Sequence, residues 1–202
     1  MIRAGIIGGA GYTAGELIRL LVNHPQVRLA FVHSTSNAGN RIADVHGGLE
    51  GDTELRFADT CDLASIDVLF LCSAHGESRK WLEANDVPAG VKIIDLAQDF
   101  RDESDGFVYG LPELNRDRIR TAERVANPGC FATAIQLALL PLAAAGLLTG
   151  EVHVTAVTGS TGAGVKPSAT THFSWRTDNI SVYKAFTHQH LIEIGRNPVS
   201  YT

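Results

Sequence analysis

Cys130 has the sequence surroundings of a reactive cysteine. It stands in ANPGCFATA, directly behind Asn-Pro-Gly and directly ahead of a long apolar run. Asn127 can cap a helix, Pro128 suits its first turn, and residues 132–148 supply the helical body. A thiol at the N-terminal end of a helix has its thiolate form stabilised by backbone N–H groups, which can also hold an oxyanion. We therefore predict that Cys130 is a nucleophile.

The alternative for any free cysteine is a small buried hydrophobic side chain. We expect this of Cys61 and Cys72, which lie in or near apolar runs of the first half of the chain. For Cys130 the Asn-Pro-Gly turn favours a side chain that points outward.

A candidate proton carrier lies near the end of the chain, in KAFTHQHLIEI. His190 and Glu193 are three residues apart and share a face if a helix starts at His190, so the carboxylate can orient the imidazole. His188 shares a side with His190 only if the segment is extended, and we prefer His190 as the partner of the cysteine. A metal site or a purely structural histidine pair is the alternative.

A glycine-rich turn, GGAGYTAGEL, follows the first apolar run and opens a helical pattern. Gly8 and Gly11 let backbone N–H groups approach a pyrophosphate, and Tyr12 and Thr13 stand in the same turn. The spacing departs from G-x-G-x-x-G, and tight turns use glycine for structural reasons as well. Its position after a strand favours dinucleotide binding.

The second predicted strand ends in HSTSNAGNR, without the Asp or Glu that an NAD-preferring site places there. Ser34, Ser36 and Arg41 supply hydroxyls and a positive charge instead, which favours NADP. The alternative is an ordinary solvated loop. A cysteine nucleophile beside a nicotinamide has one common use, which is to form a thioester or thiohemiacetal and exchange hydride with the cofactor.

The elements that must position these residues follow from the apolar runs. Residues 3–7, 27–33, 67–73 and 91–96 are nearly continuous apolar runs with helical patterns between most of them. This alternation predicts an α/β fold with a doubly wound parallel (Rossmann-type) sheet. We assign residues 1–149 to an NADP-binding domain that includes the cysteine and its helix. Residues 150–202 form the start of an incomplete α+β substrate and dimerisation domain, opening with a strand at 151–158.

The composition is that of a globular protein that handles small molecules. The chain has 202 residues, is 45% hydrophobic, and carries a net charge of −5 with a pI near 5.9. Because the sequence has no basic clusters, we do not expect nucleic acid or an anionic membrane as a partner. Three cysteines, an odd number, without a signal-peptide pattern fit the cytoplasm.

Six motifs together resemble the N-acetyl-gamma-glutamyl-phosphate reductase family: GGAGYTAGEL, DLAQDFR, YGLPELNRD, ANPGCFATA, TGSTGAG and THQHLIEI. The resemblance implies NADPH-dependent reduction of N-acetyl-glutamyl 5-phosphate to the semialdehyde with release of phosphate, a step of arginine biosynthesis. It implies that Cys130 attacks the acyl phosphate and that His190, supported by Glu193, is the acid/base. It also implies a homo-oligomer in the full-length family.

The resemblance assigns further binding residues position by position. Ser160 and Gly162 are expected at the cofactor, whereas Asn127, His188, Gly164 and Lys166 are expected at the substrate or phosphate. Three features depart from the family pattern: no proline precedes Glu193, Phe131 replaces a common tyrosine, and the chain ends early, so we expect a C-terminal truncation. The missing strands would cover the active site and supply dimer contacts.

Other functions remain open from the sequence. An aspartate-semialdehyde dehydrogenase uses the same cysteine and histidine logic, and a carrier-protein-linked reductase of the lysine pathway is related to the same family. A hypothesis of another class is a fragment that binds nucleotide without catalysis, because the hydrophobic surface meant for the missing sheet is exposed.

Overall fold

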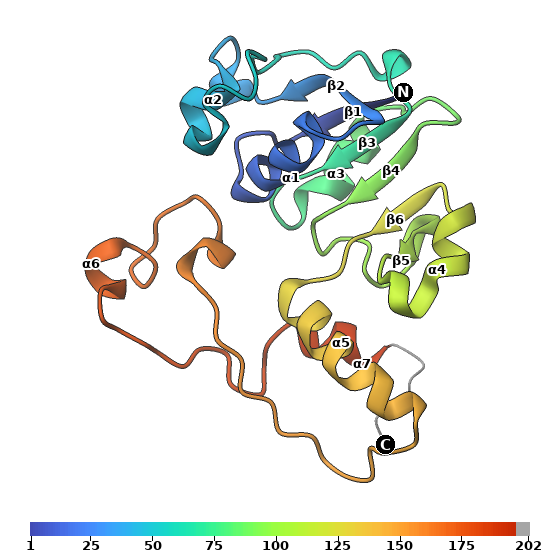
Figure 1. Cartoon of the computed structure of the whole chain (residues 1–202), viewed down its shortest axis with the longest axis vertical. Helices are drawn as coiled ribbons and strands as arrows, with labels where there is room; N and C mark the ends of the chain where they lie inside the picture. Colours follow the sequence, from blue (N-terminus) through green and yellow to red (C-terminus); the bar gives the residue numbers. More distant parts are fainter. Residues whose placement is uncertain (197–202) are drawn as a thin grey trace. The chain divides into compact units, whose positions relative to one another are not determined.

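The first part of the chain forms a six-stranded parallel sheet in this computed structural model, which describes residues 1–196 (Figure 1). The strand order is β2-β1-β3-β4-β6-β5, and every neighbouring pair is parallel. The strands are β1 (Ile2–Ile7), β2 (Val27–His33), β3 (Val68–Leu71), β4 (Lys92–Asp95), β5 (Val108–Tyr109) and β6 (Arg124–Ala126). This sheet confirms the predicted doubly wound α/β fold.

The order of the strands reverses at β1, because the chain crosses to β2 on one side of it and to β3 on the other. In open parallel sheets, ligands bind in the crevice at the carboxyl ends of the strands beside such a reversal. The glycine-rich turn follows β1 and therefore lies at this point. Strands β5 and β6 were not predicted, since runs of two and three residues carry too little pattern to detect.

Helices cover both faces of the sheet. Helix α1 (Tyr12–Val22) packs Ala14 and Ile18 into one core with β1 and β2, whereas α3 (Glu77–Ala84) packs Trp81 and Leu82 against the opposite core. Burial of each large apolar side chain stabilises the fold by about 1.5–3 kcal/mol. Because helices cover both faces of the sheet, the strands carry apolar side chains on both faces. The remaining helices of this part are α2 (Ile42–Val45) and α4 (Pro112–Thr121).

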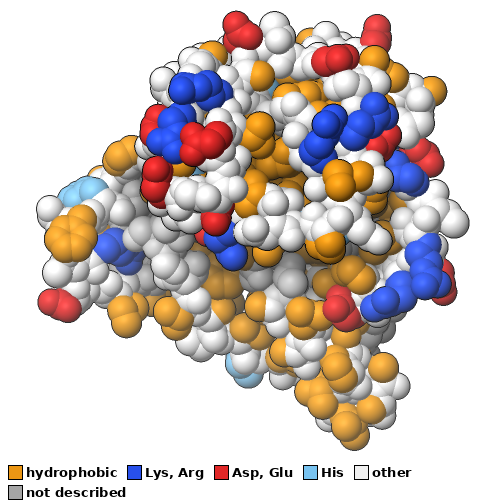
Figure 2. Space-filling model, turned by 45° about the horizontal axis from the view of Figure 1, so that its top comes forward, with side chains coloured by type: hydrophobic (Ala, Val, Ile, Leu, Met, Phe, Trp, Pro, Cys, Tyr) orange, Lys and Arg blue, Asp and Glu red, His pale blue; other side chains and the backbone are white. Residues whose placement is uncertain are grey.

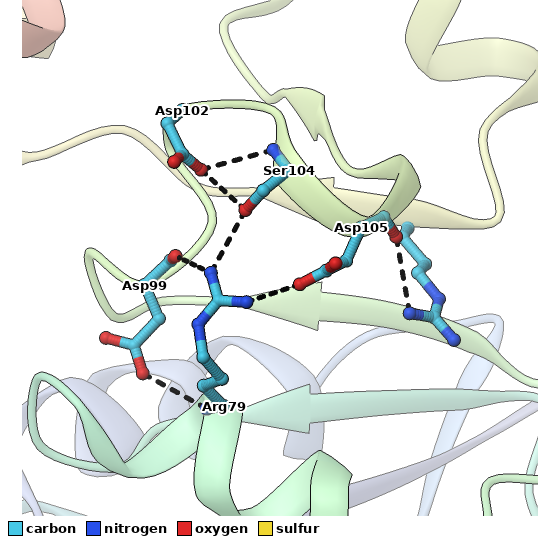
Figure 3. Close-up of polar contacts among 6 residues, drawn as sticks. Arg79, Asp99, Asp102, Ser104 and Asp105 are labelled. Carbon is cyan, nitrogen blue, oxygen red and sulfur yellow. Dashed lines mark hydrogen bonds and ion pairs between the residues drawn. The ribbon is translucent and has the colours of Figure 1, made fainter.

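The loop that follows β4 is held by Arg79 of α3 (Figure 3). The Arg79 guanidinium donates to the Asp99 carbonyl at 2.8 Å and to Ser104 Oγ at 3.0 Å, pairs with Asp105, and lies 4.5 Å from the Phe100 ring centroid. In return, Asp99 accepts the backbone N–H groups of Gly76 at 2.6 Å and Arg79 at 3.1 Å. Asp99 thus caps the start of α3.

The second part of the chain contains α5 (Cys130–Ala144), α6 (Phe173–Arg176) and α7 (His190–Gly195). The predicted strand at 151–158 was wrong: within residues 128–196 no strand is present, and this segment lies exposed. A strand needs a hydrogen-bonded neighbour, and the valines of this segment alone do not provide one. Several large side chains of this part are strongly exposed: Val157, Phe173, Ile180, Val182 and Phe186.

The contacts within the chain define two compact units, Met1–Asn127 and Pro128–Thr202. The sequence expectation placed Cys130 and its helix in the first domain, with a boundary after residue 149, and that boundary stays a prediction. Hydrophobic side chains lie open among charges of both signs on the face drawn in Figure 2. None of the helices within residues 1–196 is long and apolar enough to cross a bilayer.

An ion pair at the amino ends of β1 and β3 generates a prediction about acid stability. Arg3 donates hydrogen bonds to the Asp67 carboxylate from Nε at 3.1 Å and from Nη2 at 2.7 Å. The Arg3 backbone N–H also donates to Asp67. These hydrogen bonds from Arg3 lower the pKa of Asp67 from 3.8 to about 2. A carboxylate with a lowered pKa stabilises the fold above its unfolded pKa, and this contribution disappears as the pH falls toward the folded value.

We expect Asp67→Asn to lower the urea midpoint at pH 7 and the deficit to shrink progressively between pH 4 and pH 2. Equilibrium unfolding of parent and variant at several pH values measures this difference. Glu83→Gln on the exposed face of α3 removes the same charge elsewhere and serves as the control. A deficit that stays constant with pH contradicts the ionic role of Asp67.

Candidate functional site

Cys130 is the first residue of α5, and its side chain is exposed. Gly129 is the N-cap with extended backbone angles, so the helix begins at the cysteine itself. The N–H groups of the first three helical residues have no acceptor within the helix, and together with the helix dipole they favour negative charge at this end. Asn127 was expected at the N-cap of this helix, but the extended Gly129 takes that position.

Glu193 binds the turn that carries Cys130. Its Oε1 accepts the Gly129 N–H at 2.8 Å, and this hydrogen bond is buried. Helix α7 begins at His190, as the sequence predicted, and buries one face formed by His190, Glu193 and Ile194. The exposed fractions of His190 and Glu193 are only 6% and 7%. Two candidate catalytic groups are therefore fixed in the same unit as the candidate nucleophile.

His188 lies in a group of rings next to Cys130. Its ring centroid is 4.5 Å from that of His190, 5.2 Å from that of Phe131 and 5.8 Å from that of Tyr183, each in an edge-on arrangement. His188 Nδ1 also accepts the His190 backbone N–H at 3.2 Å. The structure thus brings both histidines to one place, although the sequence expectation allowed this only for an extended segment. The bend at Gln189, which precedes α7, makes it possible.

Burial and nearby charges shift the pKa values of His188 and Tyr183. Burial, followed by the positive charge of Lys184, lowers the pKa of His188 below its usual value, while Glu193 acts in the opposite direction. Burial, followed by the charge of Cys130, raises the pKa of Tyr183. His188 therefore favours its neutral form near pH 7, and Tyr183 keeps its proton.

Sequence reasoning missed Tyr183 as a neighbour of the cysteine. Tyr183 stands five residues before His188. Neither the helical nor the strand periodicity brings side chains at this spacing into contact, so the sequence did not indicate it. Positive φ angles at Lys184 and Phe186 fold the segment back, and such angles at non-glycine residues are not readable from sequence.

The other two cysteines differ from Cys130. Burial, followed by the charge of Asp95, raises the pKa of Cys72 to about 12, and burial raises the pKa of Cys61. Both therefore favour the thiol at neutral pH, in agreement with their interpretation as small hydrophobic side chains.

The glycine-rich turn has the backbone geometry that a pyrophosphate needs. Gly8 directly follows β1 with φ +78°, and a Cβ there would lie 2.8 Å from the Cys72 carbonyl carbon. Gly11 is the N-cap of α1, and Tyr12 and Thr13 follow it as exposed first-turn residues. The N–H groups of this first turn have no acceptor within the helix, so they are suited to bind an anion. This donor set fits a dinucleotide.

The residues expected to select NADP lie directly after β2. Ser34 is buried, and its Oγ is 3.4 Å from Ser36 Oγ, with Asn37 donating to both hydroxyls. Arg41 is engaged elsewhere: its guanidinium lies 3.3 Å from Glu54, 3.4 Å from Glu50 and 3.6 Å from Asp44. These carboxylates, led by Glu50, raise the pKa of Arg41. A cofactor phosphate would have to compete with them for this side chain.

The remaining predicted residues are placed as follows. Asn127 lies at the end of the first unit, where its N–H donates to the Asp95 carbonyl at 2.7 Å and its carbonyl accepts from Arg101 at 2.9 Å. In the loop 159–166, Ser160 is half-buried, and Gly162, Gly164 and Lys166 are exposed. Gly164 has φ +89°, a conformation that glycine adopts without strain. The loop belongs to the same unit as Cys130.

Taken together, the second unit can perform nucleophilic chemistry. It holds an exposed sulfur at a helix start, a buried carboxylate bonded to the adjoining turn, and two histidines in ring contact. The first unit can hold a dinucleotide through backbone N–H groups and hydroxyls. Among the described residues no group of three or more His, Cys, Asp or Glu side chains is arranged to hold a metal ion.

Two family profiles match the chain, one for each unit. The semialdehyde dehydrogenase NAD binding domain matches residues 3–122, and the semialdehyde dehydrogenase dimerisation domain matches residues 130–200. Among individual proteins, the N-acetyl-gamma-glutamyl-phosphate reductase of Bacteroides thetaiotaomicron is 66% identical over 199 residues, which are 98% of this chain and 62% of that protein. The protein of the same name from Azobacteroides pseudotrichonymphae is 65% identical over 196 residues, 96% of this chain and 62% of its own length.

Solved structures of lower identity share the fold. The aspartate semialdehyde dehydrogenase of Candida albicans, solved with NADP, aligns with a TM-score of 0.60 and 17% identity over 73% of this chain and 48% of its own. Aspartate semialdehyde dehydrogenase II of Vibrio cholerae aligns with a TM-score of 0.57 and 23% identity over 72% of this chain and 47% of its own.

The match of the first profile covers more than half of the chain, and the second covers most of the remainder. The chain spans 62% of the length of the reductases that it matches. It belongs to the semialdehyde dehydrogenase family, and over nearly its whole length it is similar to the N-acetyl-gamma-glutamyl-phosphate reductases.

Proposed function

We propose that this chain carries the cofactor site and the nucleophile of an NADPH-dependent N-acetyl-gamma-glutamyl-phosphate reductase. The reaction would convert N-acetyl-L-glutamyl 5-phosphate to the 5-semialdehyde and phosphate, as a cytoplasmic step of arginine biosynthesis. The observation that carries the proposal is the exposed Cys130 at the start of α5, tied through Gly129 to a buried Glu193. The identity of 62–66% to six reductases over this region supports the substrate.

In the proposed first step, the Cys130 thiolate attacks the acyl carbon, a C–S bond forms, and the C–O bond to phosphate breaks. The phosphate leaves with the bonding electron pair, so this step needs no redox partner. The developing oxyanion is stabilised by the N–H groups at the start of α5. His188, with its lowered pKa, and Lys166 are proposed to orient the substrate and its phosphate.

In the second half of the reaction the thioester is reduced and the thiolate leaves. When bound, NADPH supplies a hydride at the acyl carbon. His190 is proposed as the proton carrier for the oxygen that becomes the aldehyde, because it is buried beside His188 in the same unit as the sulfur. Glu193 is proposed to support His190 and to hold the Cys130 turn through Gly129.

The proposed cofactor residues are backbone and hydroxyl groups. Gly8, Gly11, Tyr12 and Thr13 surround the turn that would hold the pyrophosphate, and Ser34 and Ser36 stand where the ribose phosphate of NADP would lie. No acidic side chain ends β2, which supports NADP over NAD. Ser160 and Gly162 are proposed to complete the cofactor site and Gly164 and Asn127 the substrate site, by their match to the family motifs.

A homo-oligomer is part of the proposal, and two kinds of alternative to the proposed activity are considered beside it. The match to a dimerisation domain supports a homo-oligomer. A protein that binds nucleotide without turnover is the second candidate, favoured by side chains such as Phe186 at 95% and Val182 at 88% exposure. Aspartate-semialdehyde and carrier-linked substrates are the alternatives within the same chemistry.

We expect Cys130→Ser to abolish turnover, because a serine hydroxyl is not ionised at the start of α5 and is a far weaker nucleophile. The loss should be on the order of 10³-fold or more. The reverse reaction measures it, as NADPH formation from NADP, phosphate and N-acetylglutamate semialdehyde. Cys61→Ser is the matched control and should keep the parental rate.

Three outcomes of this assay contradict the proposal. Parental turnover by Cys130→Ser excludes covalent catalysis by this sulfur, and NADPH binding by a parent chain that turns over no semialdehyde supports the nucleotide-binding alternative. Faster turnover of aspartate semialdehyde than of the acetylated substrate would assign the chain to the other branch of the family.

The hydrogen bond between Glu193 and Gly129 generates a second prediction. Glu193→Ala leaves a buried N–H without its acceptor, which costs about 1–3 kcal/mol of unfolding free energy. Glu193→Gln keeps an acceptor oxygen, so we expect a stability within about 1 kcal/mol of the parent. The lost charge should nevertheless change the pH profile of the reverse reaction. Equal pH profiles for Glu193→Gln and the parent would show that the carboxylate has only a structural role.

A further inference from the structure

His46 lies against the glycine-rich turn, although it is distant from it in sequence. Its Nε2 is 2.8 Å from the Gly9 carbonyl oxygen, and a carbonyl only accepts, so His46 Nε2 carries the hydrogen and donates. We propose that His46 is a positioning residue that orients the backbone of the turn for the pyrophosphate of the cofactor. This inference rests on the dinucleotide site proposed above.

The peptide geometry explains how one hydrogen bond can orient the turn. In a trans peptide the carbonyl and the following N–H point in opposite directions, and no cis peptide bond occurs in the described residues. Fixing the Gly9 carbonyl toward His46 therefore turns the Ala10 N–H away from His46. The described residues offer this N–H no acceptor, whereas its neighbours Gly9 and Gly11 donate to His33 and Gly8. Ala10 is thus a donor available to an anion.

Gly15 makes room for the imidazole. A Cβ at Gly15 would lie 2.6 Å from His46 Nδ1 and 2.9 Å from its Cε1, and Cβ atoms in proteins do not come this close to other heavy atoms. Gly15, the last glycine of GGAGYTAGEL, thus accommodates a side chain from the segment between β2 and β3.

The position of His46 is fixed by buried neighbours. It follows α2 directly, its N–H donates to the Ile42 carbonyl at 2.9 Å, and its carbonyl accepts from Leu49 at 2.9 Å. Ile42, Leu49 and Phe57 are 0%, 2% and 3% exposed, and the Phe57 ring centroid is 6.1 Å from that of His46. These contacts hold the imidazole in place, so its hydrogen bond acts on the backbone of the turn.

Ligand binding to the 202-residue chain tests this inference without turnover. His46→Leu removes the donor and keeps an apolar body, and we expect about 10-fold weaker NADPH binding, the effect of one misoriented hydrogen bond to a charged group. His46→Gln keeps a donor at a similar distance from the backbone and should bind within about 3-fold of the parent. Adenosine 2′-monophosphate has no pyrophosphate, so its affinity should be the same in all three proteins. Fluorescence titration with NADPH and competition by the nucleotide measure these affinities.

Each result has a defined consequence. Parental NADPH affinity in His46→Leu, or an equal loss for NADPH and adenosine 2′-monophosphate, contradicts the inference while leaving the cofactor assignment intact. A parent chain that does not bind NADPH contradicts the cofactor assignment and this inference with it.

A double-mutant cycle tests the packing even if His46→Leu is poorly folded. Alanine is otherwise favoured over glycine in a helix, so Gly15→Ala should raise the Tm when the imidazole is absent, in His46→Ala. In the parent the added methyl meets the ring, and we expect the same change to lower the Tm. Thermal unfolding of the four proteins gives the sign in each background. The same sign in both backgrounds would show that His46 does not occupy the space over Gly15.

Discussion

The hydrogen bond from the Gly129 N–H to Glu193 is the constraint on which the candidate active site depends. It joins residues that are 64 positions apart and draws the short helix α7 against the turn that opens α5. Six residues of helix have little stability of their own, so α7 depends on the burial of His190, Glu193 and Ile194. A carboxylate near the N–H groups of a helix start is also in a favourable electrostatic position. The same bond therefore holds the fold of the second unit and the geometry beside the sulfur.

The first unit uses the same kind of interaction at its own candidate site. Asp99 reaches back from the loop after β4 to the N–H groups that open α3, and His46 reaches back from the loop after β2 to the Gly9 carbonyl. In each case a polar side chain satisfies a backbone group at the carboxyl edge of the sheet, where loops would otherwise be free to move. Parallel strands end at this edge, and the ladder offers no further partners there. Side-chain to backbone bonds therefore determine how the binding edge is shaped.

The sequence predicted the parts of this molecule that repeat a simple pattern. Strand β2 was expected at the residues where it lies, and β1, β3 and β4 within a few residues, because strands buried on both faces read as apolar runs. The start of α7 at His190 and the exposed position of Cys130 were also expected. The contacts of His46 with Gly9 and of Tyr183 with its neighbouring rings could not be predicted, since they depend on loop paths and positive φ angles. The segment 151–158 is rich in valine and threonine, as strands are, yet pairing requires a partner that local pattern does not specify.

The side chains proposed for nucleophilic chemistry and the backbone groups proposed for the cofactor belong to different units. Cys130, His188, His190 and Glu193 all belong to the second unit, and the bonds and ring contacts among them lie within it. In the proposed reaction, activation of the nucleophile and movement of protons would therefore draw on the internal order of that unit. The groups that suit a dinucleotide belong to the first unit and are mostly backbone N–H groups, which are set by the turn after β1. In the proposed reaction, thioester formation would thus draw on the groups of the second unit, whereas hydride transfer would also draw on the dinucleotide site of the first.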